Sequence, residues 1–174
     1  MNYLLLNQET TRLRFRPLEK EDFNAWFPFF EDKVILTYFG IDTSLSQQQL
    51  CENWFAKVFD RYENNLGGMN AMILKETGAL IGQCGLLIQT VQDKERLEVG
   101  YSLLPQYRGF GYGTEAAVKC KEFAFENLLA EALMSMVHVD NKASEKVALK
   151  NGMLLESVLE YDGMMAKIYT IEKG

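Results

Sequence analysis

The sequence predicts a mixed α/β fold in which helices cover a mostly antiparallel sheet. Two periodicities support this prediction: some apolar segments alternate as in a β-strand, and others repeat as in an amphipathic helix. A third observation gives the strand directions. Short turns join several neighbouring strands and make them antiparallel, whereas a helix predicted between residues 104 and 133 makes its flanking strands a parallel pair. The expected element order is βααβββαβαββ.

The first third of the chain predicts one strand and two helices. Residues 11–16 alternate apolar side chains with arginines, as in a strand. Residues 19–32 predict an aromatic-rich helix that Pro28 breaks or kinks. The second helix is expected at residues 45–64. Ser44 is its predicted N-cap, because a glutamine follows three residues later at the spacing of a capping box.

From residue 69 onward the hydrophobic pattern changes to that of β-strands. Gly78 occupies the predicted turn of one hairpin, residues 93–96 form the next turn, and Pro105 ends the strand that follows. Gly152 is the predicted C′ residue of the last helix. The strands are expected at residues 70–74, 79–90, 97–104, 133–139, 154–160 and 166–172, and the helices at residues 111–127 and 142–151.

Length and composition favour one folded domain, residues 1–174. Hydrophobic residues make up 48% of the chain, which allows a substantial core and excludes an intrinsically disordered protein. The net charge of −6 disfavours nucleic-acid binding, because that activity depends on basic contacts to phosphates. The same charge favours a cationic substrate.

Three widely spaced cysteines, Cys51, Cys84 and Cys120, form neither a disulfide framework nor a zinc site, so no metal is expected. Such cysteines are typical of a reducing compartment, and the expected location is cytoplasmic. The first ten residues lack the basic flank and the apolar length of a signal peptide. No apolar stretch has the length of a transmembrane helix, so no membrane association is expected.

The most informative segment is Arg-Gly-Phe-Gly-Tyr-Gly-Thr at residues 108–114, between a predicted strand and a predicted helix. Glycines at alternate positions let backbone amides converge on one point, and the first turn of the helix adds unpaired N–H groups. Together they predict a phosphate or diphosphate site, to which Arg108 adds a charged donor. The glycine spacing matches neither a dinucleotide fingerprint nor a Walker loop. A flexible turn without a ligand is the alternative.

Arg108, Gly111 and Gly113 form an Arg-x-x-Gly-x-Gly pattern that resembles the acyl-CoA diphosphate loop of the GNAT acetyltransferase superfamily. Further segments resemble its RimJ/RimL-type branch in order and spacing, over residues 11–172. These segments are Thr11-Arg12-Leu13 with Arg16-Pro17, Glu98-Val99-Gly100-Tyr101, and Asn141 and Ser144 followed by Gly152-Met153. The resemblance implies the GNAT fold, a twisted, mostly antiparallel mixed sheet with a splayed parallel pair and helices on both faces.

The resemblance also implies that acetyl-CoA is the co-substrate and that its diphosphate binds the amides of residues 108–114. Its pantetheine arm is expected between strands that end near Leu103 and Val139, paired with backbone near Leu103, where a strand amide would bind the oxyanion. Gly100 marks either a bulge that starts the separation of these strands or a site of close packing. The predicted cofactor-binding residues are Leu103, Arg108, Gly109, Gly111, Gly113, Thr114 and Asn141.

Glu98 and Ser144 are the predicted catalytic residues. Glu98 matches the glutamate implied to remove a proton from the amine, and its apolar strand is expected to raise its pKa. A solvent-facing carboxylate paired with Arg96 is the alternative. Ser144 matches the serine implied near the CoA sulfur, but a serine in a first helical turn also bonds to backbone, and Asn141 is equally typical of an N-cap. Many members have a tyrosine where Ala148 stands, so protonation of the thiolate is unassigned.

The resemblance implies an acetyl-CoA-dependent N-acetyltransferase that acts by direct attack of a primary amine in a ternary complex. The expected acceptor is a protein N-terminal α-amine, a polyamine or an amine-bearing small molecule, and the protein is expected to be a monomer or homodimer. The alternative function is a non-catalytic acyl-CoA-binding module that regulates a partner. Glu98 and Ser144 disfavour that alternative, whereas Ala148 is compatible with it.

Overall fold

A seven-stranded sheet organises the chain in the computed structural model, which describes residues 3–174. Met1 and Asn2, which begin the segment expected to lack a signal peptide, lie outside the described residues. The strands are β1 (Leu13–Pro17), β2 (Gly67–Leu74), β3 (Leu80–Val91), β4 (Lys94–Leu103), β5 (Ala132–His138), β6 (Leu154–Tyr161) and β7 (Met164–Glu172). The helices are α1 (Phe23–Trp26), α2 (Lys33–Tyr38), α3 (Gln47–Glu63), α4 (Tyr112–Glu126) and α5 (Lys142–Lys150).

The strand order across the sheet is β1-β2-β3-β4-β5-β7-β6. All neighbouring strands are antiparallel except β4 and β5, which are parallel because α4 connects them. This parallel pair is short: Leu97 faces Leu133 and Glu98 faces Met134, and the pairing ends there. The structure thereby confirms the predicted mixed sheet and its splayed parallel pair.

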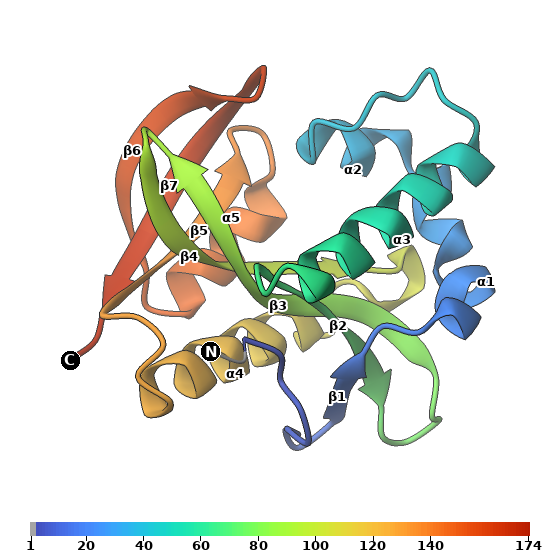
Figure 1. Ribbon diagram of the computed structural model, residues 1–174, viewed down its shortest axis with the longest axis horizontal. Helices are drawn as coiled ribbons and strands as arrows, with labels where there is room; N and C mark the ends of the chain where they lie inside the picture. Colours follow the sequence, from blue (N-terminus) through green and yellow to red (C-terminus); the bar gives the residue numbers. More distant parts are fainter. Residues whose placement is uncertain (1–2) are drawn as a thin grey trace.

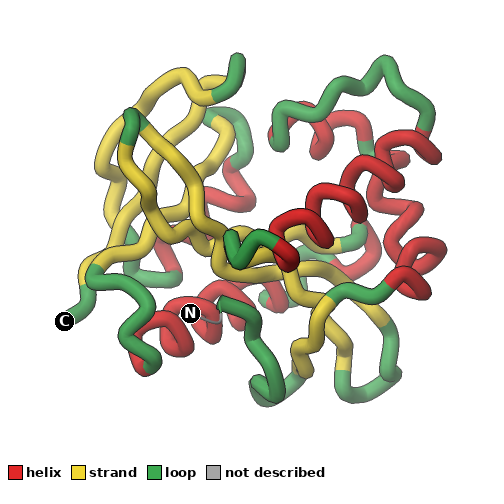
Figure 2. The backbone as a smooth tube through the Cα atoms, in the orientation of Figure 1, coloured by secondary structure: helices red, strands yellow, loops and turns green. Residues whose placement is uncertain are grey.

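Helices cover both faces of the sheet, as predicted. On one face, α4 and α5 pack small buried side chains such as Ala117, Cys120 and Ala148 against the strands. On the other face, α1 and α3 contribute Trp26 and Phe55 to a second apolar layer. In Figure 1, α3 and α4 lie on opposite sides of the central strands. In Figure 2, the helical segments before β2 lie opposite the strands β5–β7 in the view.

The helix predicted at residues 19–32 is divided into three pieces. Pro28 lies at the start of a 3₁₀ helix, Phe27–Glu31, which follows the four-residue α1, and a second 3₁₀ turn, Lys20–Asp22, precedes α1. Proline has no N–H to donate within a helix, which accounts for the break. The short helix α2, which the sequence did not predict, begins directly afterwards.

The N-cap of α3 differs from the prediction. Ser46, rather than Ser44, caps the helix: its hydroxyl accepts the N–H of Gln49, and the Gln49 side chain accepts the N–H of Ser46. Both serines have a glutamine three residues later, so the spacing alone does not choose between them. The Asp42 carboxylate accepts the N–H of Ser44 and holds that residue in a turn before the helix.

The turn between β3 and β4 is also tighter than predicted. Only Gln92 and Asp93, with φ of 50° and 61°, lie between the paired ends Val91 and Lys94. Two left-handed residues are typical of a two-residue hairpin turn, whose twist matches that of the strands. Residues 94–96, expected in the turn, therefore belong to β4. Within residues 3–174, no helix is long and apolar enough to cross a membrane.

The assignment of the α3 cap can be tested with two neighbouring serines. Ser46→Ala should lower the free energy of unfolding by about 1 kcal/mol, because it removes the hydroxyl that accepts the Gln49 N–H. Ser44→Ala is the matched control and should have a much smaller effect. Urea denaturation of both variants measures the difference. An equal loss in the two variants would contradict the assignment.

Candidate active site

The separation of β4 and β5 opens a cleft with a volume of about 700 Å³. Its walls come from β4, β5, α2, α3, the glycine loop before α4, and α5. All the predicted site residues line this one cleft: Glu98, Leu103, Arg108, Gly109, Gly111, Gly113, Thr114, Asn141 and Ser144. Residues up to 46 positions apart in the sequence are therefore brought to a common surface.

Two side-chain hydrogen bonds cross the gap where the strands begin to separate. The Ser135 hydroxyl donates to the Val99 carbonyl at 2.9 Å, and the Met136 N–H donates to Glu98 Oε1 at 3.3 Å. These bonds satisfy backbone groups that the missing ladder leaves unpaired. Further along, the facing edges of β4 and β5 border the cleft.

Gly100 does not form a bulge. The β3–β4 register runs through the Gly85–Gly100 pair without a shift, so the strands separate without one. A Cβ atom at residue 100 would lie 2.8 Å from Leu87 Cδ1, so a larger residue would require the Leu87 side chain to move. Of the two alternatives open in the sequence, the structure supports close packing.

The glycine loop adopts a backbone conformation that favours glycine. Gly109 and Gly111 have φ of 85° and 84°, in the left-handed region where most side chains are strained. Gly111 is the N-cap of α4, so the unpaired amides of the first turn follow it directly. Gly113 lies in that turn, buried against β4, and Thr114 lines the cleft beside it. The loop has the local geometry of an anion-binding site.

Arg108 points part of its guanidinium toward α2. Its Nη1 donates to Asp32 Oδ2 at 2.5 Å, and its Nε donates to the Leu103 carbonyl at 3.1 Å. The hydrogen bond from Arg108 lowers the pKa of the Asp32 carboxyl below its ordinary value, although burial acts in the opposite direction. Asp32 also accepts the Ile35 N–H and so caps α2. The remaining nitrogen, Arg108 Nη2, is buried and has no hydrogen-bond partner among the residues that the structure describes.

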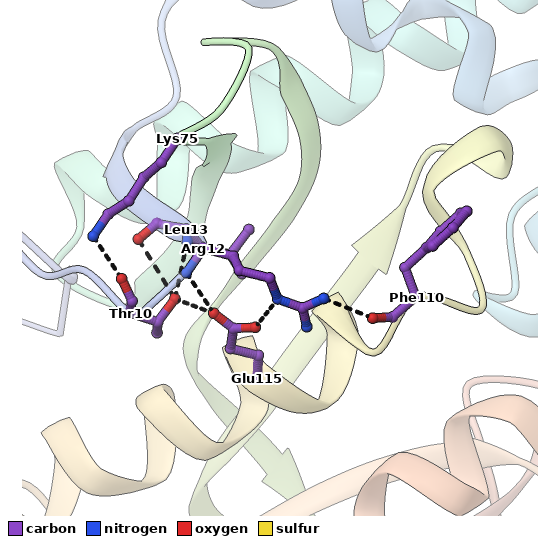
Figure 3. Close-up of polar contacts among 6 residues, drawn as sticks. All are labelled: Thr10, Arg12, Leu13, Lys75, Phe110 and Glu115. Atoms are coloured by element: carbon purple, nitrogen blue, oxygen red, sulfur yellow. Dashed lines mark hydrogen bonds and ion pairs between the residues drawn. The ribbon is translucent and has the colours of Figure 1, made fainter.

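The loop is held from its other side by the beginning of β1 (Figure 3). In the first turn of α4, the Glu115 carboxylate accepts hydrogen bonds from the Thr10 hydroxyl at 2.5 Å and from Arg12 Nε at 2.7 Å. The same arginine donates from Nη1 to the Phe110 carbonyl at 2.9 Å, and its guanidinium lies 4.4 Å from the centre of the Tyr112 ring. Arg12, directly before β1, therefore links the middle of the loop and the first turn of α4 to this edge of the sheet.

Glu98 is a half-buried carboxylate within the gap between the strands. Its Oε2 accepts a hydrogen bond from Gln89 Nε2 at 2.8 Å, and it has no bond to Arg96, which pairs with Glu156 instead. Burial raises the pKa of Glu98 above its ordinary value, and the bonds from Gln89 and Met136 offset part of this effect. A carboxylate with a raised pKa in a cleft is a candidate proton acceptor.

Ser144 contacts Tyr101, a residue that the sequence placed in a motif without giving it a role. The phenol oxygen lies 2.6 Å from the Ser144 hydroxyl and 2.9 Å from the Ser144 carbonyl. Burial raises the Tyr101 pKa, so the phenol keeps its proton. Asn141 is the N-cap of α5, because its side chain accepts the Ser144 N–H, and Ala148 is buried in the core. Sequence patterns do not predict the contact between Tyr101 and Ser144, because it depends on how β4 and α5 are placed in the fold.

Within residues 3–174, no group of three or more His, Cys, Asp or Glu residues is arranged to hold a metal ion. The three cysteines are buried and unpaired. His138, on the wall of the cleft, stacks its ring on Tyr38 with the centroids 4.9 Å apart.

The Glu115 network predicts a pH-dependent contribution to stability. Burial opposes ionisation of Glu115, but the bonds from Thr10 and Arg12 outweigh it and lower its pKa below 4.5, the ordinary value for an unfolded chain. The stabilisation is thus complete above that value and is lost as the pH falls through the lower, folded-state pKa. Glu115→Gln should lower the free energy of unfolding at neutral pH, and the difference should shrink below a pH of about 4.

Urea denaturation at the two pH values measures this effect. Glu122→Gln, on the exposed face of the same helix, is the matched control and should show no such pH dependence. A Glu115→Gln deficit of equal size at both pH values would contradict the electrostatic explanation.

Comparison with known proteins agrees with this geometry. The family described as "Acetyltransferase (GNAT) domain" matches residues 12–154. The uncharacterized protein YkkB of Bacillus subtilis (strain 168) is 31% identical over 147 residues, which cover 83% of this chain and 83% of that protein.

Solved structures give the same result. An acetyltransferase from Agrobacterium tumefaciens str. C58 has a TM-score of 0.80 at 26% identity, covering 99% of this chain and 98% of that one. RimL, a ribosomal L7/L12 α-N-protein acetyltransferase solved in complex with coenzyme A, shares the fold with a TM-score of 0.75 at 16% identity, covering 95% and 97%. The chain belongs to the GNAT family of acetyltransferases.

Proposed function

We propose that this acyltransferase is an acetyl-CoA-dependent N-acetyltransferase of the RimJ/RimL type, formed by one domain and acting in the cytoplasm. The observation that carries the proposal is the position of Glu98. This carboxylate lies in the gap between β4 and β5, in the same cleft as the glycine loop. A donor-binding loop and a proton acceptor thus share one surface, as direct transfer requires.

Acetyl-CoA would bind along the separated strands. The loop amides from Arg108 to Thr114 would hold the diphosphate, and Asn141 would contact the donor from α5. The pantetheine amides would pair with the free edge of β4 near Leu103, whose amide would also bind the oxyanion. The left-handed glycines and the open strand edges support this assignment, since neither is explained by packing alone.

Glu98 would act as the base. The amine nitrogen attacks the thioester carbonyl carbon, a C–N bond forms, the C–S bond breaks, and the amine proton moves to Glu98. An amine must be unprotonated to attack, and a carboxylate with a raised pKa accepts a proton more readily than an ordinary one. The hydrogen bonds from Gln89 and Met136 would hold Glu98 in position.

The Tyr101–Ser144 pair would stabilise the departing thiolate in place of the tyrosine that Ala148 replaces. The phenol can donate to the Ser144 hydroxyl, which leaves the serine proton free to bond the sulfur. Before the thiolate forms, the phenol can instead donate to the Ser144 carbonyl. A neutral hydroxyl pair provides hydrogen bonds at the sulfur and leaves final protonation to solvent.

The acceptor would be a primary amine: a protein N-terminal α-amine, a polyamine or an amine-bearing small molecule. The protein is proposed to act as a monomer or homodimer. The alternative function, a non-catalytic acyl-CoA-binding module, keeps the loop but needs no base. Release of CoA with a panel of amines distinguishes the two, because the module would bind acetyl-CoA and turn over none of them.

Removing the base should affect the rate more than donor binding. Glu98→Gln should lower kcat by about a hundredfold or more, because the neutral amide accepts no proton. In the wild type, kcat should rise with pH through the Glu98 pKa, which burial raises above the ordinary value, and this rise should be absent in the variant. Calorimetry should show unchanged acetyl-CoA affinity.

Glu95→Gln, on the exposed part of the same strand, is the control and should retain both rate and pH profile. If the pH–rate profile of Glu98→Gln equals that of the wild type, Glu98 is not the base.

The glycine loop is tested by Gly111→Val. A branched side chain at φ of 84° is strained and obstructs approach to the loop amides, so calorimetry should detect no acetyl-CoA binding. Gly78→Val is matched in strain, because Gly78 has φ of 71° in a hairpin turn with open space around it, and it should bind normally. Near-native affinity in Gly111→Val would refute the assignment.

A further inference from the structure

The cleft has a second charged wall, on α3, which contains none of the residues predicted from the sequence. Lys57 and Arg61 both line the cleft. They are four positions apart in one helix and therefore lie on the same face. Glu98 and Tyr161 border the same end, and the charge of Arg61 acts on the titration of both. Two cations thus lie beside the carboxylate proposed to accept the amine proton.

Arg61 is a buried cation without a directly paired carboxylate among the described residues. The residue is 9% exposed, and its Nη2 donates to the backbone carbonyls of Leu66 at 2.9 Å and Ile88 at 2.6 Å. Its Nε is buried without a hydrogen-bond partner, and none of the described residues 3–174 places a carboxylate within 4.0 Å of the guanidinium. Burial lowers the Arg61 pKa, and the charges of Glu98, Tyr161 and Asp60 offset only part of this effect, so burying the guanidinium carries a net cost. An anion at this site would offset that cost.

The acidic residues near this wall have other roles. Asp42 accepts the Ser44 N–H at 2.9 Å, and Asp162 lies in the turn between β6 and β7. Asp60, whose charge acts on Arg61, accepts a hydrogen bond from the Asn64 side chain at 3.0 Å. Glu98 is held by Gln89 and a backbone amide. Lys57 has no ion pair with any described residue, so both cations of α3 are available to a ligand.

We propose that the acceptor carries a carboxylate as well as its primary amine, and that Arg61 and Lys57 bind this carboxylate. The inference rests on the proposed N-acetyltransferase function and specifies its substrate class. The Arg61 guanidinium matches a carboxylate in shape and charge, and the nearby Lys57 ammonium adds a second donor group. An amino acid, or a peptide with an acidic side chain near its amino terminus, contains both required groups.

The same wall disfavours a polyamine. An ammonium of such an acceptor that approached α3 would meet two cations in a partly desolvated cleft, where repulsion is stronger than in water. The net charge of −6 favours cations at long range, but distant surface charges are screened by salt. The nearest side chains therefore determine which acceptor is bound.

Matched acceptor pairs test the proposal through CoA release. Among free amino acids, glutamate is compared with glutamine. Among peptides, those with Asp as the second residue are compared with those with Asn at that position. The two pairs distinguish a free amino acid from a peptide as the acceptor. Spermidine is the cationic acceptor. In at least one pair, the acidic member should have the higher kcat/KM, and the preference should weaken at high salt.

Lys57→Gln should reduce the acid-to-neutral preference about fivefold, the effect of one exposed ion pair. The ratio of the two rates is the readout, because the charge of Lys57 also acts on Glu98 and so affects every acceptor. Lys94→Gln removes the same charge from the β3–β4 hairpin, outside the cleft, and should leave the preference unchanged. Arg61→Lys keeps the positive charge but loses the paired N–H donors of the guanidinium, so it should also reduce the preference for acidic acceptors. Thermal unfolding checks that it still folds, since Arg61 holds two carbonyls.

The outcomes separate this inference from the function on which it rests. Turnover of neutral amines or spermidine without any preference for acidic acceptors would overturn the carboxylate site and leave the N-acetyltransferase intact. An acidic preference that Lys57→Gln and Arg61→Lys both leave unchanged would also overturn it. Acetyl-CoA binding without turnover of any amine would instead refute the proposed function itself.

Discussion

The early end of the β4–β5 pairing is the constraint on which the candidate site depends. After two residue pairs the strands separate, and their backbone donors and acceptors need other partners. Ser135 and Glu98 supply the first of these across the gap. Beyond them the strand edges face the cleft, which is where an extended ligand can complete the ladder. Glu98, which bonds to β5 across the gap, is also the candidate base, so one carboxylate has both a structural contact and a proposed chemical role.

Two charged contacts hold the glycine loop against this gap. Arg108 connects it to the N-cap of α2, and Arg12 connects it to β1 through Glu115. Three of the seven residues at positions 108–114 are glycines, which leave the amides accessible but offer no side chain that could pack. The conformation of the loop therefore depends on neighbours from other parts of the chain. Through Asp32, the glycine loop is linked to α2, which forms another wall of the same cleft.

Features encoded by local pattern could be predicted from the sequence, and features that depend on tertiary contact could not. Strand alternation predicted the sheet, and the helix that follows the glycine loop predicted its parallel pair. The choice of Ser46 over Ser44 depended on Asp42, and α2 was too short for a periodic pattern. The Tyr101–Ser144 contact and the unpaired Arg61 required β4, α5 and α3 to be placed in space. The nine predicted site residues converge on one cleft, but their chemical roles remain predictions.

The bonds from Arg12 to Glu115 have a consequence for how the molecule folds. The two residues are 103 positions apart, so their contact closes a very long loop of chain. Contacts of such high sequence separation form slowly, because most of the chain entropy must be lost first. We expect the glycine loop to become rigid late in folding, after β1 has joined β2 and α4 has docked. Conversely, fraying of the first strand would remove the Arg12 contacts and leave the loop held by Arg108 alone, while the rest of the sheet remains intact.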